Sequence, residues 1–349
     1  MKIRLNYNLY VQPHGDGVVL HLPDDEVLKI QEKDYIADVL SHIKEYGALG
    51  SDTVYEMLVS RHALTHEEFD DILKQLIDSN IAKIEQDIPD TISKRNLQKF
   101  DRQLKSFATI KGNSLADAIY FQEKLMTTKV GVLGVGGVGS YVAYGLTCMG
   151  IGYLKLIDHD HIELSNTSRQ MLYDESDVGK LKVEVAKQKL SLVNTETNIT
   201  TVNKKITCAK DLETQLSNLD ILILCADTPR GKIVYIVDDA CQAQSVPFIC
   251  GSPMANQIFC GPLIIPGQTR RYRDIFPEPA NEKDDNLNSM FDYINQDFVA
   301  TIIDPYNAIA AKIVVLEVVK HLTSFQPCQV IDNVVTLDTN TWQSQCYSV

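Results

Sequence analysis

The stretch Val130-Gly-Val-Leu-Gly-Val-Gly-Gly-Val-Gly139 decides the fold of most of this 349-residue chain. An apolar strand runs directly into a turn in which Gly134, Gly136 and Gly139 have G-x-G-x-x-G spacing. A helical spacing of apolar residues follows, at Val142, Leu146 and Met149. Glycine lets the backbone turn tightly and approach a phosphate at the N-terminus of the following helix. The stretch therefore predicts a nucleotide-binding strand-turn-helix unit, without saying which nucleotide or which chemistry.

Apolar strands and helical patterns alternate from residue 129 onward. Predicted strands end at Gly134 and Asp158 and cover 198–203, 219–225, 247–250, 257–265 and 334–338, and predicted helices cover 181–193, 230–243 and 305–323. This alternation is typical of an α/β fold with a doubly wound, mainly parallel sheet. The polar stretch 267–300 exceeds normal loop lengths, so we expect a functional crossing loop there.

The first 88 residues predict a separate, smaller domain. Alternating residues around Pro13-His-Gly-Asp-Gly17 indicate a hairpin. Helical patterns follow, at Ile36–Ile43, Ser51–Leu58 and Thr65–Ile77, the last opened by a capping box of Thr65 and Glu68. A short closing strand at 81–84 and a polar linker at 85–100 come next. Three small helices with flanking strands resemble a winged helix, so we expect a domain at 1–88 and a second at 89–349.

The charge is concentrated in the small domain. The whole chain has a net charge of −13, and residues 1–90 contain 8 Lys and Arg against 18 Asp and Glu. Winged helices usually bind DNA, but an acidic surface lacks the basic stripe that a phosphate backbone requires. The domain also resembles the elements that grip leader peptides of ribosomally made peptides, where the peptide adds a strand beside the third helix. We favour a peptide clamp over a structural appendage or a nucleic-acid module.

Composition places the protein among cytoplasmic globular proteins. No segment is apolar for the roughly 18 residues of a membrane helix, and the first residues contain no apolar signal region. None of the eight cysteines forms a C-x-x-C pair. Buried, reduced thiols are the simplest interpretation, and a zinc site or a catalytic cysteine is the alternative.

Polar groups follow several of the predicted strands. Asp158 stands where a carboxylate receives a ribose hydroxyl, and Asp160 follows it. Further candidates come later in the chain: Asn166, Arg169, Gln170, Lys182, Asp227 and Arg230. The glycine motif alone is typical of a dinucleotide-dependent dehydrogenase. Two cations and a carboxylate near strand ends, where α/β sheets bind ligands, make that interpretation weaker.

The order of these residues resembles the ubiquitin-activating-like adenylating enzymes of the ThiF and MoeB type. Their pattern is a G-x-G-G-x-G loop, an Asp after the second strand, N-x-x-R-Q, a Lys opening the next helix, and D-x-x-x-R. This chain has Gly134, Gly136, Gly137 and Gly139, then Asp158, Asn166, Arg169, Gln170 and Lys182, and finally Asp227 and Arg230, with one residue fewer between these two than in the family's pattern. Upstream, Phe100-Asp-Arg102-Gln-Leu104 matches the family's Y-S-R-Q-L segment. The resemblance covers roughly residues 98–325.

The resemblance implies ATP- and Mg²⁺-dependent activation of a carboxylate. Asp158 would hold the ribose, Arg169 and Lys182 would neutralise phosphates, and Asp227 would bind the magnesium ion. Asp160, Asn166, Gln170 and the four glycines would complete the ATP site, and Arg230 would contact ligand or support its loop. By the same resemblance, Arg102 reaches the ATP of a partner subunit, which implies a homodimer with a site completed in trans.

The chain departs from the sulfur-carrier activators at their zinc site. Their segment resembles T-P-C-Y-R-C-L-F-P-E, and here Arg271 and Asp274 stand at the cysteine positions of Thr269–Glu278. A second cysteine pair is absent around Asp338–Gln345. We therefore predict no structural zinc. Cys250 and Cys260 lie near strand ends, where packing is the better explanation than thioester formation.

These departures favour the peptide-modifying branch of the family, which includes the microcin C adenylyltransferase and the pantocin enzyme. The expected function is adenylation of a carboxylate on a ribosomally made precursor peptide in antibiotic biosynthesis. Nucleotide transfer or glutamate cross-linking would follow. Arg270, Arg271 and Arg273 would either receive the peptide carboxylate or be solvated. The alternatives are a sulfur-carrier activator, a non-catalytic Rossmann-type binding protein and a dehydrogenase; no membrane or nucleic-acid partner is expected.

Overall fold

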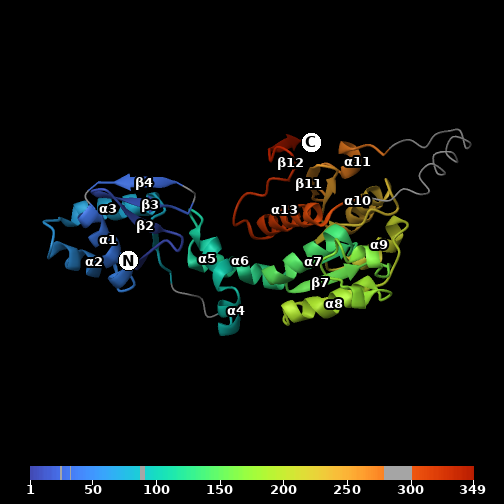
Figure 1. Ribbon diagram of the computed structural model, residues 1–349, viewed down its shortest axis with the longest axis horizontal. Coiled ribbons are helices and arrows are strands. Elements are labelled where there is room, and N and C mark those ends of the chain that lie inside the picture. Colours follow the sequence, from blue (N-terminus) through green and yellow to red (C-terminus); the bar gives the residue numbers. More distant parts are fainter. Residues whose placement is uncertain (24–25, 32, 87–90, 279–300) are drawn as a thin grey trace, which may run out of the picture. The chain divides into compact units, whose positions relative to one another are not determined.

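A computed structural model describes residues 1–23, 26–31, 33–86, 91–278 and 301–349 (Figure 1). The chain divides into two compact units, Met1–Glu123 and Lys124–Val349. Most of the predicted crossing loop, residues 279–300, and part of the predicted linker lie outside the described residues. In the described part of the chain, no helix combines the length and apolarity needed to cross a membrane.

The first unit begins with two small antiparallel sheets and three helices. Strands β2 (Tyr10–His14), β3 (Gly17–His21) and β4 (Val27–Ile30) form one sheet in that order. The second sheet pairs β1 (Ile3–Leu5) with β5 (Ala82–Ile84). Helices α1 (Lys33–Tyr46), α2 (Ser51–Val59) and α3 (His66–Asp78) lie between them in sequence. The predicted hairpin, the three helices and the capping box of Thr65 and Glu68 are all confirmed.

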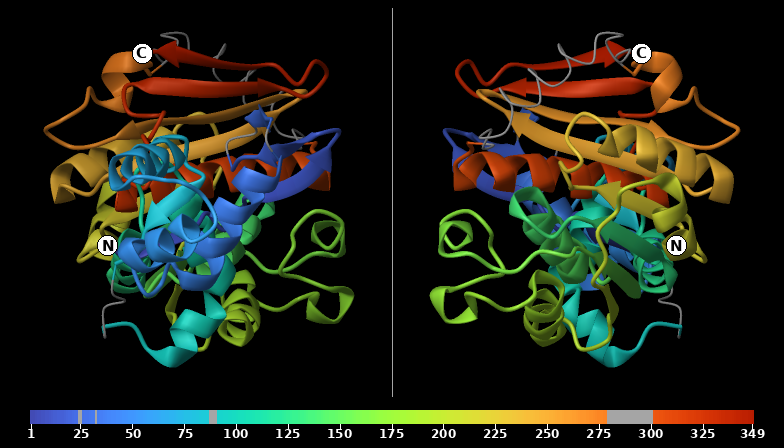
Figure 2. Two further views of the ribbon diagram at one scale, coloured as in Figure 1. Left: turned by 90° about the vertical axis from the view of Figure 1, so that its left-hand side faces the viewer. Right: turned by 90° about the vertical axis from the view of Figure 1, so that its right-hand side faces the viewer.

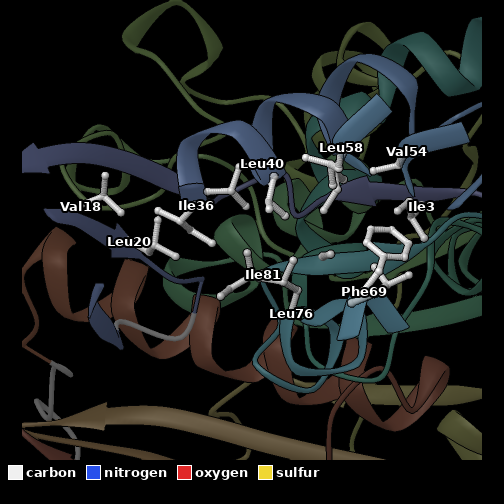
Figure 3. Close-up of a cluster of buried hydrophobic side chains, with 14 of the residues drawn as sticks. Ile3, Val18, Leu20, Ile36, Leu40, Val54, Leu58, Phe69, Leu76 and Ile81 are labelled. Atoms are coloured by element: carbon white, nitrogen blue, oxygen red, sulfur yellow. The ribbon is translucent and has the colours of Figure 1, made fainter. Parts of the chain in front are cut away.

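An apolar core holds these helices and strands together (Figure 3). It joins Ile3 of β1 and Leu20 of β3 to Leu40, Leu58 and Phe69 of the three helices, and each of these side chains is at most 5% exposed. Removing such apolar surface from water is the main favourable term in folding. The helical periodicity of the sequence therefore marks a real core rather than an isolated set of amphipathic helices.

Three helices complete the first unit and carry the chain toward the second. They are α4 (Lys94–Lys99), α5 (Asp101–Thr109) and α6 (Leu115–Thr127), the last of which spans the division between the units. Lys83 of β5 donates a hydrogen bond to the carbonyl of Ile110, just after α5. This contact joins α5 to the small sheets, and the boundary expected at 88/89 stays a prediction.

The second unit contains one eight-stranded sheet in the order β13-β12-β11-β10-β9-β6-β7-β8. The parallel part consists of β6 (Lys129–Leu133), β7 (Tyr153–Ile157), β8 (Asn198–Val202), β9 (Ile221–Leu224) and β10 (Phe248–Met254). An antiparallel extension adds β11 (Gln257–Ile264), β12 (Asn333–Asp338) and β13 (Ser344–Ser348). The prediction of a mainly parallel α/β sheet is confirmed, whereas β13 had no predicted counterpart.

Helices cover both faces of this sheet, which explains why strands such as β9 are buried along their whole length (Figure 2). On one face, α9 (Ala209–Leu216) and α10 (Ile233–Gln244) form a core with Leu222, Leu224 and Phe248. The others are α7 (Gly137–Met149), α8 (Lys182–Val193) and α13 (Asp304–Thr323), with α13 packed along α7, β10 and β11. A one-turn helix, α11 (Tyr272–Ile275), and two short 3-10 turns, Leu164–Asn166 and Glu175–Asp177, complete the described elements.

Candidate nucleotide site at the carboxyl ends of the central strands

The central strands bring three candidate loops to one edge of the sheet. The chain runs from β6 to β7 in one direction across the sheet and to β9 on the other side of β6. The loops that begin at Gly134, Asp158 and Cys225 therefore leave neighbouring strands, and open α/β sheets bind ligands at such a switch point. The amide of Gly134 donates to the Ile157 carbonyl at 2.8 Å, and the amide of Cys225 donates to the Leu133 carbonyl at 2.8 Å.

Two of the glycines are required by packing. Gly134 has a φ of +88°, and a Cβ there would lie 2.6 Å from the amide nitrogen of Ala226. A Cβ on Gly139 would lie 1.9 Å from the carbonyl oxygen of Gly134. By contrast, a Cβ on Gly136 would meet nothing nearer than a Gln170 nitrogen at 3.7 Å. The surroundings of Gly136 are therefore open within the protein, as a position that faces a ligand requires.

Helix α7 begins at this turn and presents its N-terminus there. Its N-cap is Gly136, and no side-chain capping hydrogen bond is made there within the described residues. The first N–H groups of a helix lack intrahelical partners, and the helix dipole makes this end favourable for an anion. The turn of Gly134, Gly136, Gly137 and Gly139 thus leads into the N-terminus of α7, and its role as a phosphate cradle stays a prediction.

Asp158 is fixed by the backbone around it. Its carboxylate accepts a hydrogen bond from the Val135 amide at 2.7 Å and another from the Asp160 amide at 2.9 Å, and the residue is 9% exposed. These bonds tie the end of β7 to the glycine turn. They also leave each carboxylate oxygen a further lone pair with which to accept a hydroxyl proton.

Lys182 and Asp160, which were predicted separately, are brought together. The Lys182 ammonium lies 3.0 Å from a carboxylate oxygen of Asp160, and the Lys182 amide donates to the Asp160 carbonyl at 3.0 Å. The Lys182 side chain is only 8% exposed, although that of Asp160 is about half exposed. A buried lysine with one carboxylate partner is held in a defined direction and remains able to donate further hydrogen bonds.

The turn at 163–170 places the remaining candidates. Asn166 is buried and its side-chain oxygen accepts the amide of Glu163, so it shapes the turn. Gln170 is also buried, and its side-chain oxygen has no hydrogen-bond partner among the residues that the structure describes. Arg169 donates to the carbonyl of Ser165 at 2.5 Å, and the described residues give it no carboxylate partner. A positive charge without a counter-ion and an orphaned amide oxygen fit a site that awaits a polar ligand.

Asp227 stands on an exposed loop just beyond β9. One carboxylate oxygen accepts from Thr228, and the other lies 3.1 Å from the Arg230 guanidinium. Mg²⁺ prefers oxygen ligands and usually keeps several waters, so one accessible carboxylate beside a phosphate site fits this ion. Among the described residues, the side chains that lie close enough together to hold a metal ion belong to another loop and are Asp158, His159 and Asp160. Asp160 pairs with Lys182 as Asp227 pairs with Arg230, so these ion pairs do not distinguish the two carboxylates, and Asp227 stays the predicted magnesium ligand on the family resemblance.

Sequence reasoning missed two residues that hold this site together. Tyr173 is buried, and its hydroxyl donates toward the carbonyls of Val135, at 2.8 Å, and Lys182, at 3.3 Å. Burial, with the neighbouring Asp158 and Asp160, raises the pKa of Tyr173 far above its usual value, so it stays a neutral donor. Nothing in a local motif marks this tyrosine, because its partners lie 38 and 9 residues away.

Asn307 of α13 is the second missed residue. It is 2% exposed, and its side-chain amide donates to the Arg169 carbonyl at 3.3 Å. The same amide nitrogen would lie 2.6 Å from a Cβ at Gly137. Asn307 therefore joins the start of α7 to the turn that carries Arg169. It lies far along the chain from both partners, so no local pattern could have found it.

The arginines at 271 and 273 are engaged within the protein. Arg271 donates to Asp238 at 3.0 Å and to Asp239 at 2.6 Å, and Arg273 donates to Asp239 at 2.9 Å and to Glu278. Asp238 is fully buried. Sequence reasoning offered solvation or capture of a peptide carboxylate for these two residues, and the structure gives them acidic partners of the chain itself.

The candidate thiols also have a structural explanation. Burial raises the pKa of Cys250 to about 11, and it also raises the pKa values of Cys225 and Cys260. A nucleophilic cysteine needs a lowered pKa, because the thiolate is the reactive form. The prediction that Cys250 and Cys260 serve packing is therefore favoured, whereas Cys148, Cys208 and Cys346 are exposed rather than buried.

Comparisons with known proteins agree with this geometry. The ThiF family pattern matches residues 100–348. The sulfur carrier protein ThiS adenylyltransferase of Escherichia coli is 29% identical over 160 residues, which is 45% of this chain and 61% of that protein. The chain spans 33% to 62% of the length of such curated relatives.

Two solved structures share the fold over nearly the whole chain. The crystal structure of E. coli MccB with AMPCPP and MccA has a TM-score of 0.79 and 22% identity, and it covers 100% of this chain and 97% of its own. The crystal structure of PaaA has a TM-score of 0.72, also at 22% identity, and covers 98% of both chains. With its glycine turn, its polar residues and a family match over most of its length, the chain belongs to the ThiF family.

Proposed function

We propose that this protein is an ATP-dependent adenylyltransferase that activates a carboxylate of a precursor peptide. The observation that carries the proposal is the convergence of an uncapped helix N-terminus, Asp158 and Lys182 at one switch point of the sheet. A hydride-transfer enzyme would need the glycine turn but not a buried lysine and a separate arginine beside it.

The reaction requires neutralisation of the negative charge on the two reactants and does not require a general base. A carboxylate has a pKa near 4 and is already an anion at neutral pH. One of its oxygens would attack the α-phosphorus of ATP, the bond to the bridging oxygen of pyrophosphate would break, and an acyl adenylate and pyrophosphate would form. The barrier comes from two anions approaching each other, so positioned cations and backbone amides supply most of the catalysis.

Each site residue has a role in this scheme. The first amides of α7 would receive phosphate oxygens, and Asp158 would accept a ribose hydroxyl. Lys182 and Arg169 would neutralise the charge that develops around the α-phosphorus. Asp227 would hold Mg²⁺, which when bound shields the pyrophosphate charge. Asp160 keeps the Lys182 ammonium in place through their 3.0 Å contact.

The peptide part of the proposal is supported by the first hundred residues. They lie ahead of the family match, which begins at residue 100. Structures that match the whole chain include E. coli MccB bound to MccA. In the small domain, β2 and β4 are the outer strands of their sheet. An extended peptide can add to such an edge, and the acidic composition suits a basic or neutral peptide.

The proposed enzyme acts as a homodimer in which Arg102 completes the ATP site of the partner subunit. The Arg102 side chain is 95% exposed, and its guanidinium lies 3.7 Å from the carboxylate of its neighbour Asp101. An arginine held outward in this way is available to a second copy of the chain. This role remains a proposal that the complementation experiment in the Discussion tests.

A zinc site does not fit the residues that stand at its expected place. Arg271 occupies one position and is committed to Asp238 and Asp239. Asp274 occupies the other, and neither residue supplies the thiolates of a structural zinc site. We therefore propose that the protein folds without structural zinc.

A second candidate function is activation of a ubiquitin-like sulfur carrier. The curated relatives at 29–33% identity, named for ThiS and molybdopterin synthase, favour it. Such a substrate ends in Gly-Gly, whereas the proposed substrate is a short precursor peptide. The adenylation chemistry would be the same, so only the substrate distinguishes the two functions.

The test is ATP–pyrophosphate exchange with two kinds of substrate. One is the set of short peptides translated from reading frames beside the gene, and the other is a ThiS-type carrier protein. We expect exchange, and a mass change of the substrate, with a peptide and not with the carrier. Lys182→Met should abolish exchange, and Lys187→Met, on an exposed position of the same helix, should not. Exchange with the carrier alone would overturn the peptide assignment, and no exchange with either would overturn the activity.

A further inference from the structure

Three polar side chains of the small domain are buried where its two-stranded sheet meets α5. Asn6 is 4% exposed, Asn80 is 3% exposed and Lys83 is 8% exposed. Burying polar groups costs free energy unless they are hydrogen-bonded. We call Asn6, Asn80 and Lys83 the polar joint. Their hydrogen-bond partners show which part of the fold these side chains hold in place.

All three side chains donate to carbonyls at the end of α5. Asn80 donates to the Thr109 carbonyl at 3.0 Å, and Asn6 donates to the same oxygen at 3.3 Å. Lys83 donates to the Ile110 carbonyl at 2.7 Å and to the Asn113 carbonyl at 3.1 Å. Asn6 also donates to the backbone and side-chain oxygens of Asn80, each at 3.0 Å.

The chemistry of a helix end explains this choice of residues. The last carbonyls of a helix have no intrahelical donors, and the helix dipole makes that end favourable for a cation. A buried ammonium and two amides satisfy these needs from another part of the fold. Burial, together with the charge of Arg4, lowers the pKa of Lys83 to about 8, which shows how far the group is withdrawn from water.

The other end of the same helix carries Arg102. Helix α5 runs from Asp101 to Thr109, so about 10 Å separates the Arg102 backbone from the polar joint at 1.5 Å per residue. The side chain of Arg102 is almost fully exposed, whereas Leu104 and Phe107 of the same helix are buried. Because a short helix is rigid, hydrogen bonds from the small domain to the C-terminal end of α5 also fix the position of its N-terminal end relative to that domain.

We propose that Lys83, with Asn6 and Asn80, is a positioning residue for Arg102, so that the small domain and α5 move as one body. This inference rests on the proposed function, because it takes Arg102 to be a ligand of ATP. Its consequence is that a peptide held by the domain and the arginine supplied to ATP share one rigid support. Peptide capture and completion of the ATP site are then mechanically linked.

The experiment measures ATP binding to the full chain by calorimetry in the presence of Mg²⁺. We expect Arg102→Ala and Lys83→Met each to weaken the Kd for ATP about tenfold, the effect of one lost charge-assisted contact. The double variant should be no weaker than Arg102→Ala, because both changes remove the same contact. Lys83→Arg, which keeps a cation at the helix end, should recover most of the affinity. Lys44→Met, on an exposed position of α1, should bind ATP as the unchanged chain does.

Hydrogen exchange of the α5 amides gives a readout that does not depend on ATP. We expect amides of 104–109 to exchange at least tenfold faster in Lys83→Met than in the unchanged chain, with the core of α1–α3 unaffected. The inference would be overturned if Arg102→Ala weakened ATP binding and Lys83→Met did not. It would also be overturned if the α5 amides of Lys83→Met exchanged hydrogen at the same rate as in the unchanged chain. If the unchanged chain binds no ATP, or Arg102→Ala binds it normally, the proposed function fails instead, and hydrogen exchange alone decides whether the joint grips α5.

Discussion

Two glycines of the turn have different surroundings, so alanine substitutions can distinguish a glycine required by packing from one that faces a ligand. Gly139→Ala places a Cβ 1.9 Å from the Gly134 carbonyl oxygen, so the backbone of the turn has to shift. We expect the free energy of unfolding to fall by about 1–3 kcal/mol, as for an overpacked core. Gly136→Ala meets nothing within 3.7 Å and should leave stability nearly unchanged while weakening ATP binding.

Urea unfolding and ATP calorimetry of the two glycine variants check this prediction. Equal losses of stability would contradict it, because they would mean that the turn is uniformly packed. Normal ATP binding by Gly136→Ala would remove this position from the phosphate cradle.

Tyr173 provides the second residue-scale prediction. Tyr173→Phe removes the hydroxyl that joins the Val135 and Lys182 carbonyls and leaves those buried acceptors without it. We expect a loss of stability of about 1 kcal/mol and a higher KM for ATP, with kcat less affected. Steady-state exchange kinetics and thermal unfolding measure both effects. A variant with wild-type KM would show that the hydroxyl serves stability alone.

At the residue scale, sequence reasoning found the charged groups and missed their supports. Asp158, Lys182 and Asp227 follow strands or open a helix, so their positions could be inferred from the order of elements. Tyr173 and Asn307 could not be found this way, because their function depends on partners distant in sequence. The predicted roles of the site residues in binding ATP remain predictions.

At the scale of elements, a network of ion pairs fastens α11 to α10. A four-residue helix cannot sustain itself, because helix formation has a costly nucleus. The buried Asp238 carboxylate accepts from Arg271 and, at 3.3 Å, from the amide of Tyr272. Asp238→Asn should lower the free energy of unfolding by about 1.5–3 kcal/mol, the range for hydrogen bonds to charged groups.

Asp239→Asn is the matched control for this network. Asp239 is 46% exposed, so its ion pairs are screened by solvent and should contribute less. Urea unfolding and limited proteolysis near residue 272 measure the effect of both variants. A larger loss for Asp239→Asn than for Asp238→Asn would show that burial does not set the strength of this network.

The same network leads to a prediction about metal content. Acidic side chains of the chain itself neutralise Arg271 and Arg273 in this segment. We expect a chelator-washed sample to contain far less than one zinc per chain and to unfold at the same temperature with or without chelator. Roughly stoichiometric zinc by atomic emission would refute the prediction.

At the scale of the whole molecule, the proposed dimer can be tested by complementation. Arg102→Ala should lose adenylation while keeping its fold, because this side chain is 95% exposed. Asp227→Ala should lose adenylation for a different reason, the loss of the proposed magnesium ligand. Mixing the two variants would create hybrid dimers in which one site has both residues intact.

We expect the mixture to recover up to about a quarter of the activity of its chains, because random pairing makes about half of the dimers hybrids and each hybrid has one intact site of two. Pyrophosphate exchange measures the recovery, and a tagged-subunit pull-down establishes that subunits have exchanged. Failure to recover any activity despite demonstrated exchange would mean that Arg102 acts within its own chain.

The sequence by itself determined the class of fold and the family resemblance. Strand-and-helix periodicity is local, and the glycine turn with its ordered polar residues is a pattern along the chain. Only the tertiary structure decided how these residues are held. It paired Lys182 with Asp160, joined the glycine turn to α8 through Tyr173, and gave Arg271 and Arg273 acidic partners. It also buried Lys83 against the end of α5. Such contacts join residues distant in sequence, and their strength depends on burial, which no local pattern records.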